Sequence, residues 1–137
     1  MNYIAILIAA VAQFIIGAIW YMPVFGKLWG KIHGFDEVPK DMQKHMQKEM
    51  LPMLGVQFLV TLVTTVVIAV LLPHIPGTWN AYTFVGFVWL GFTLPAQVSA
   101  VVFGGTKAKW IIPKILILAG GSILCVEAAA FILQWMA

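Results

Sequence analysis

Four long apolar stretches, separated by segments rich in proline, glycine or charge, constrain this chain more than any other feature. Only 9% of the residues are charged, whereas a soluble domain carries roughly 25%. Each apolar stretch is near or above the ~20 residues that a helix needs to cross the hydrocarbon core of a bilayer. We therefore predict an all-α polytopic membrane protein, a four-transmembrane-helix bundle that forms a single domain over residues 1–137. The predicted spans cover about residues 3–21, 51–72, 80–103 and 110–135.

The lysines predict which ends of the spans face the cytoplasm. Five of them fall in the first loop, 22–50, and Lys107 and Lys109 fall in the third, whereas the second loop, 73–79, has none. Basic residues accumulate in cytoplasmic loops, so the first and third loops should be cytoplasmic and both termini outside. Within the first loop, the pattern of Pro39–Met50 predicts a short amphipathic helix that leads into the second span. Because the lysines mark span boundaries, we expect no nucleic-acid partner.

Several classes of chemistry are excluded by what the chain lacks. Its single cysteine, Cys125, excludes an intramolecular disulfide. No hydrolase elbow, phosphate-binding loop, dinucleotide fingerprint or H-E-x-x-H motif occurs, and the three histidines are far apart. We expect no enzymatic activity, no cofactor and no metal site. The first apolar stretch has neither a basic segment before it nor an A-x-A site after it, so we expect a retained span rather than a cleaved signal peptide.

Glu127 is the only acidic residue inside an apolar stretch. A carboxylate near the middle of a span costs about 2.5–3.5 kcal/mol on insertion scales, so such a residue usually has a partner or a function. Lys114, the other charge in this stretch, is ~20 Å away along the helix axis. Without a cation at its depth, the carboxyl should be held in its neutral form. Three roles remain open: a structural hydrogen bond, a proton or cation site, or a contact between subunits.

The second span carries hydroxyl groups at the same depth as Glu127. Gln57, Thr61 and Thr65 recur every four residues, and Thr64 lies beside them, so they form a polar stripe on one helical face. Thr64 and Thr65 are therefore the expected hydrogen-bond partners of the carboxyl. The candidate polar or ion site consists of Glu127, Thr64, Thr65 and Thr61.

A second group of polar residues is expected in the cytoplasmic half of the spans. Counting from the span boundaries places them at similar depths, ~9 Å from the cytoplasmic side for two of them. The group would serve either as hydrogen-bonding glue between helices or as a polar cavity. Pro95 frees the carbonyl of Gly91 and predicts a kink beside it. The predicted polar layer consists of Gln13, Gln57, Gln97, Thr93 and Lys114, with Lys114 extending toward the cytoplasm.

Two spans predict an interior face from small and polar residues that recur at three- and four-residue steps. In the third span these residues are Thr83, Gly86, Leu90, Thr93 and Gln97. In the fourth they are Gly120, Leu124, Glu127, Phe131 and Gln134.

Two motifs resemble those of a known family. The first is Trp20-Tyr21-Met22-Pro23 followed by Phe25-Gly26-Lys27-x-Trp29, and the second is Trp89-Leu90-Gly91-Phe92-x-x-Pro95-Ala96. The chain resembles the DUF1761 family, small bacterial integral membrane proteins with four predicted spans, over nearly its whole length. The family signature has a serine where this chain has Met22, which removes any role for that hydroxyl. The resemblance implies the architecture and a location in the bacterial inner (plasma) membrane, and it implies no reaction.

Two functions fit these features. The first is a small oligomeric transporter or channel-like protein with Glu127 as a proton or cation site. The second is a non-transporting structural or accessory membrane subunit whose intramembrane polar residues pack helices together. Four spans alone rarely enclose a wide pore, so transport favours a homo-oligomer in the lipid bilayer. The sequence does not identify a small-molecule or ion ligand.

Overall fold

The computed structural model describes residues 1–137 and contains helices and loops only, which confirms the all-α prediction. Four helical stretches are long and apolar enough to cross a membrane: Tyr3–Val24, Lys40–His74, Ala81–Phe103 and Ala108–Trp135. In chain order the elements are α1 (Tyr3–Ile19), the π-helical turn η1 (Trp20–Val24), α2 (Gly26–Ile32), the 3₁₀ turn η2 (Phe35–Glu37), α3 (Lys40–Leu71), the 3₁₀ turn η3 (Leu72–His74), α4 (Ala81–Val88), the π-helical turn η4 (Trp89–Thr93), α5 (Leu94–Phe103), the 3₁₀ turn η5 (Ala108–Trp110) and α6 (Ile111–Trp135).

Asparagine side chains begin two of the spans. The Asn2 side-chain oxygen accepts the N–H of Ala5 at 3.1 Å, and the Asn80 oxygen accepts the N–H of Thr83 at 2.8 Å. Each satisfies a donor that the first turn of a helix leaves unpaired. The Asn2 amide also donates to the carbonyl of Met136 at 2.9 Å, so one side chain both caps α1 and joins it to the end of α6.

The predicted amphipathic helix at Pro39–Met50 is part of one continuous helix with the second span. α3 runs from Lys40 to Leu71, and Pro52 lies inside it rather than in a first turn. Proline has no N–H, so the carbonyl of Lys48 loses its intrahelical partner there. Lys48 and Pro52 are both exposed, and the helix continues through this position.

Two further prolines, Pro23 and Pro95, coincide with widened helical turns. Pro23 lies within η1, and η4 ends two residues before Pro95. The kink predicted at Pro95 is thus a π-helical turn over Trp89–Thr93, because a chain that cannot form the normal bond to Gly91 re-pairs with a wider register. Both turns begin with a tryptophan, and both tryptophans bond to α6.

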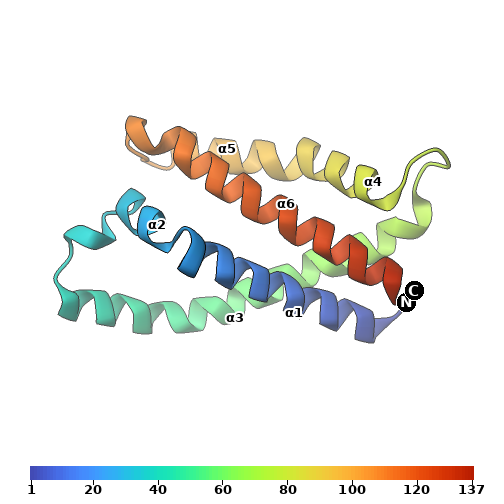
Figure 1. The fold of residues 1–137 in the computed structure, drawn as a ribbon, viewed down its shortest axis with the longest axis horizontal. Helices are drawn as coiled ribbons and strands as arrows, with labels where there is room; N and C mark the ends of the chain where they lie inside the picture. Colours follow the sequence, from blue (N-terminus) through green and yellow to red (C-terminus); the bar gives the residue numbers. More distant parts are fainter.

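The helices pack in the order α3, α1, α6 and then α4–α5. α6 lies between α1 and α4–α5 as the central helix, and α3 and α4 make little direct contact although they are joined by a short loop. Both termini lie at one end of the molecule, and α2 and the α5–α6 loop lie at the other (Figure 1). All eight lysines belong to this second end, which we call the lysine end.

The buried core lies where α1 meets α6. Ala5 and Ala9 of α1 and Ala129 and Ala130 of α6 are at most 1% exposed, and they belong to one buried cluster with larger side chains around them. Small side chains let helix backbones approach closely, which is how helices associate in lipid. The predicted interior face of α6 is therefore wrong in part, because Leu124, Phe131 and Gln134 are exposed. The predicted face of the third span is also wrong at Thr83 and Leu90, which are exposed.

Candidate intramembrane polar site

A hydrogen-bonded network joins α1 to α3. The side chain of Gln13, 4% exposed, donates to the Thr65 hydroxyl at 2.6 Å. Thr65 donates in turn to the carbonyl of Thr61 at 2.7 Å, and Thr61 donates to the carbonyl of Gln57 at 2.8 Å. The Gln57 amide reaches the Thr61 hydroxyl at 3.4 Å. Of the polar stripe predicted on the second span, Thr65 thus meets α1, whereas Gln57 is exposed and its side chain bonds only within α3.

A second network joins the third span to α6. The Trp89 indole donates to the Ser122 hydroxyl at 2.8 Å, and Ser122 lies 3.2 Å from the side-chain oxygen of Gln97. The Gln97 amide approaches the carbonyl of Leu118 at 3.5 Å. Four partly buried polar groups of the third span and α6 thus satisfy one another where these spans meet.

The single polar layer predicted in the cytoplasmic half is replaced by these two networks. Gln13 and Gln57 belong to the α1–α3 network, and Gln97 belongs to the network between the third span and α6. Thr93 lines an apolar groove between α3 and the third span, and Lys114 lies at the lysine end with its ammonium 5.8 Å from the centre of the Trp29 ring. Residues at one depth need not meet, because the rotation of each helix about its axis decides its neighbours.

Glu127 lies on the face of α6 that meets the third span, opposite Gly86 of α4. A Cβ on Gly86 would lie 3.1 Å from Oε1 of the carboxyl, so the absence of a side chain there makes room for it. The Oε2 atom is buried and has no hydrogen-bond partner. The expected bonds from Thr64 and Thr65 are not formed, since these hydroxyls donate to the carbonyls of Val60 and Thr61.

A glycine pair on α6 seats the tryptophan of the first motif. The Trp20 indole donates to the carbonyl of Ile117 at 2.8 Å. A Cβ on Gly120 would lie 2.7 Å from the Trp20 ring, and one on Gly121 would lie 2.8 Å from it. Trp20 therefore faces α6, which its position at the end of a span does not by itself indicate.

Several residues of these contacts were not identified from the sequence. Ser122 is a small polar residue in a mostly apolar helix, Trp20 resembles an ordinary interfacial aromatic, and Trp89 lies near the middle of its span. The adjacent glycines of α6 were the available signal. Each glycine lowers helix stability relative to alanine, so two together indicate that a neighbouring group approaches the helix backbone closely. Tryptophan N–H groups also need partners when buried.

An apolar groove of about 230 Å³ separates α3 from α4 and η4. Its walls are mostly aliphatic and aromatic, with the hydroxyl-bearing residues Thr64 and Thr93 among them. The groove follows from the order of packing, because α3 is held by α1 and not by the third span.

Four apolar helical spans, polar side chains paired between them and lysines gathered at one end define a polytopic helical membrane protein. The sequence model of the family described as "Protein of unknown function (DUF1761)" matches residues 4–134, so the chain belongs to this family. No curated protein and no solved structure matches it.

Removing the Thr65 hydroxyl should weaken the α1–α3 contact. We expect Thr65→Val to lower the free energy of unfolding by about 1 kcal/mol, because the buried Gln13 amide then keeps only the Ala9 carbonyl at 3.3 Å. Thr64→Val, next to it but bonded only within α3, should change stability less. Reversible unfolding in mixed micelles, followed by circular dichroism, measures both, and equal losses would contradict a specific role for Thr65.

Proposed function

We propose that this protein is a small oligomeric transporter or channel-like protein in which Glu127 is a proton or cation site. The observation that carries the proposal is the buried Oε2 atom of Glu127, which has no hydrogen-bond partner. A carboxyl that only packs helices would be expected to bond to a neighbouring helix, as Gln13 and Gln97 do. Its chemistry suits binding and movement of an ion rather than a chemical conversion.

The cost of keeping this group supports the same conclusion. An ionisable side chain in a span is expensive and usually marks an ion or proton pathway. Gly86 leaves space beside the carboxyl that a larger residue would fill. Replacing Glu127 by an apolar residue would remove a buried unpaired oxygen, so stability alone does not favour the carboxyl.

A homo-oligomer is part of the proposal. Leu124 and Phe131 are 47% and 55% exposed on the α6 surface around Glu127, and Gln134 is exposed beyond them. A second copy covering this face would shield the surface around Glu127 and would complete a path that four spans alone do not enclose.

The distribution of lysines supports an orientation. All eight lie at the end opposite the termini, so this end would face the cytoplasm and both termini would lie outside. We infer a location in the bacterial inner (plasma) membrane, with the lipid bilayer as the main partner and no nucleic-acid partner.

Flux measurements with purified protein in liposomes test the proposal. A pH-sensitive dye trapped inside the vesicles and a potassium-selective electrode in the outer solution report proton and cation movement down imposed gradients. We expect Glu127→Gln, which keeps the shape and removes the ionisable group, to reduce the flux at least tenfold. Glu49→Gln, an equal change on an exposed residue of α3, should leave the flux unchanged.

Two results would favour the accessory-subunit alternative instead. One is wild-type flux no greater than that of empty liposomes, and the other is an unchanged flux in Glu127→Gln. Native mass spectrometry of the same preparations reports the oligomeric state, and a monomer in the bilayer-mimicking micelle would contradict the homo-oligomer.

A further inference from the structure

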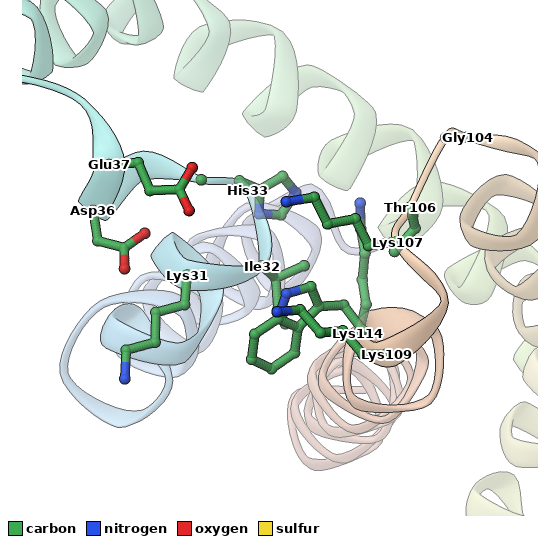
Figure 2. Close-up of a pocket in the computed structure, with 13 residues that line it drawn as sticks. Lys31, Ile32, His33, Asp36, Glu37, Gly104, Thr106, Lys107, Lys109 and Lys114 are labelled. Atoms are coloured by element: carbon green, nitrogen blue, oxygen red, sulfur yellow. The ribbon is translucent and has the colours of Figure 1, made fainter.

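An open cavity of about 620 Å³ lies at the lysine end, far along α6 from Glu127. Two segments distant in the sequence form it: the end of α2 with the turn that follows, and the α5–α6 loop with the start of α6. Figure 2 shows the carboxylates of Asp36 and Glu37 on one side of the opening and the lysines of the α5–α6 segment on the other. The volume is within the range of small-molecule sites.

The cavity has an excess of positive charge. Its lining includes four lysines but only two carboxylates, together with His33. Neither carboxylate forms an ion pair with a lysine, since the protein's one salt bridge joins His45 to Glu49 on α3. The lysines that line the cavity are Lys31, Lys107, Lys109 and Lys114.

Two of these ammonium groups are held by aromatic rings. The Lys109 ammonium lies 5.3 Å from the centre of the Trp110 ring, and the Lys114 ammonium lies 5.8 Å from that of Trp29. Contact with a ring face restrains a lysine without neutralising it. Positive charge in the cavity is therefore partly fixed in place and remains available to an anion.

A hydroxyl group in the cavity wall also lacks a partner. The Thr106 Oγ1 atom is buried and makes no hydrogen bond within the protein. Gly34 and Gly105, the only residues with positive φ in the chain, turn the backbone on the two sides of the cavity. A buried hydroxyl usually has a partner, and here the adjacent lysines favour an anionic acceptor.

We propose that this cavity binds a phosphate-bearing anion, either a phospholipid headgroup or a soluble phosphate. Lysine binds phosphate as a point charge, and the Thr106 hydroxyl would donate to a phosphate oxygen. The cavity lies where the spans end, and basic pockets between membrane helices bind anionic headgroups. The site is independent of the proposed role of Glu127, so either can fail without the other.

Calorimetric titration of the purified protein in a neutral detergent tests this site. The probes are inorganic phosphate and short-chain phosphatidylglycerol. We expect the double variant Lys107→Gln/Lys109→Gln to bind about 25-fold more weakly, at roughly fivefold per lysine. The control Lys44→Gln/Lys48→Gln makes the same change of charge on exposed α3 residues outside the cavity, and it should bind within twofold of the wild type.

The hydroxyl separates a built site from diffuse surface charge. Thr106→Val should weaken binding about tenfold, because a hydrogen bond to a charged group is lost, and Thr106→Ser should bind as the wild type does. Binding of the lipid alone would identify a membrane headgroup, and equal binding of inorganic phosphate would identify a soluble anion; both support the proposal. It is overturned by absence of binding at millimolar probe, by equal losses in both lysine pairs, or by an unchanged Thr106→Val.

Discussion

The double variant Gly120→Ala/Gly121→Ala should lower the free energy of unfolding by about 3 kcal/mol. The new methyl groups would lie 2.7 and 2.8 Å from the Trp20 ring, well inside van der Waals contact. The indole cannot simply tilt away, because it bonds to the Ile117 carbonyl at 2.8 Å and packs against Phe25 with 4.7 Å between ring centres. α1 and α6 must therefore move apart or the tryptophan must leave its slot.

The same change at open positions should have the opposite sign. Nothing lies within 4 Å of a Cβ placed on Gly17 of α1 or Gly55 of α3. Alanine favours a helix over glycine by about 1 kcal/mol per residue, so Gly17→Ala/Gly55→Ala should stabilise the protein modestly. Reversible unfolding in mixed micelles, followed by circular dichroism, compares the two pairs directly.

A double-mutant cycle identifies the tryptophan as the cause. In a Trp20→Ala background the two glycine substitutions should no longer destabilise, because the atoms they would meet are gone. If the α6 pair is as stable as the control pair, or if the loss persists without the indole, then Trp20 does not occupy the glycine slot.

The existence of the helices followed from the sequence because it depends on local chemistry. A helix is the simplest way for an apolar stretch of ~20 residues to satisfy its backbone in lipid. The helix at Pro39–Met50 was also predictable, because its charged residues and its methionines each recur every four residues. What the sequence did not indicate is that α3 continues through Pro52, because a proline marks a helix end more often than it lies within one.

The partners of the polar side chains could not be predicted with the same success. Counting residues gives a depth along a helix, but the side that a helix turns to each neighbour depends on packing. α6 turns its alanines to α1, and this rotation directs Glu127 toward Gly86 of α4 and away from the threonines of α3. Gln13 then meets Thr65 because α1, not α6, packs against the stripe on α3.

The neighbours of the two tryptophans could not be predicted from the sequence either. Trp20 lies at the end of its span, where a ring can face either lipid or protein, and Trp89 lies near the middle of the third span. Residues of α6 decide the orientation of both rings. Gly120 and Gly121 leave space for Trp20, whose indole donates to the Ile117 carbonyl, and the Ser122 hydroxyl accepts the Trp89 indole.

The contact between α1 and α6 should be the part of the protein most sensitive to a larger side chain. Ala9 is 0% exposed, and it belongs to one buried cluster with Ala129 and Ala130, which are equally inaccessible. We expect Ala9→Leu to lower the free energy of unfolding by about 3 kcal/mol or more, because three added carbon atoms have no space there. Lipid gives no compensating gain, since it solvates a leucine side chain as well as a protein core does. Ala18→Leu is the matched control, because Ala18 is exposed on the same helix.

Cys125 provides a second measurement of the same variant. Its thiol lies 3.5 Å from the Gln13 carbonyl, one turn along α1 from Ala9 and partly covered by α1. Separation of the two helices should therefore speed reaction of Cys125 with a membrane-permeant maleimide in Ala9→Leu and leave it unchanged in Ala18→Leu. Equal stability and equal labelling in the two variants would contradict close α1–α6 packing. A higher free energy of unfolding together with faster labelling would also contradict it, because both measurements depend on the separation of the same two helices.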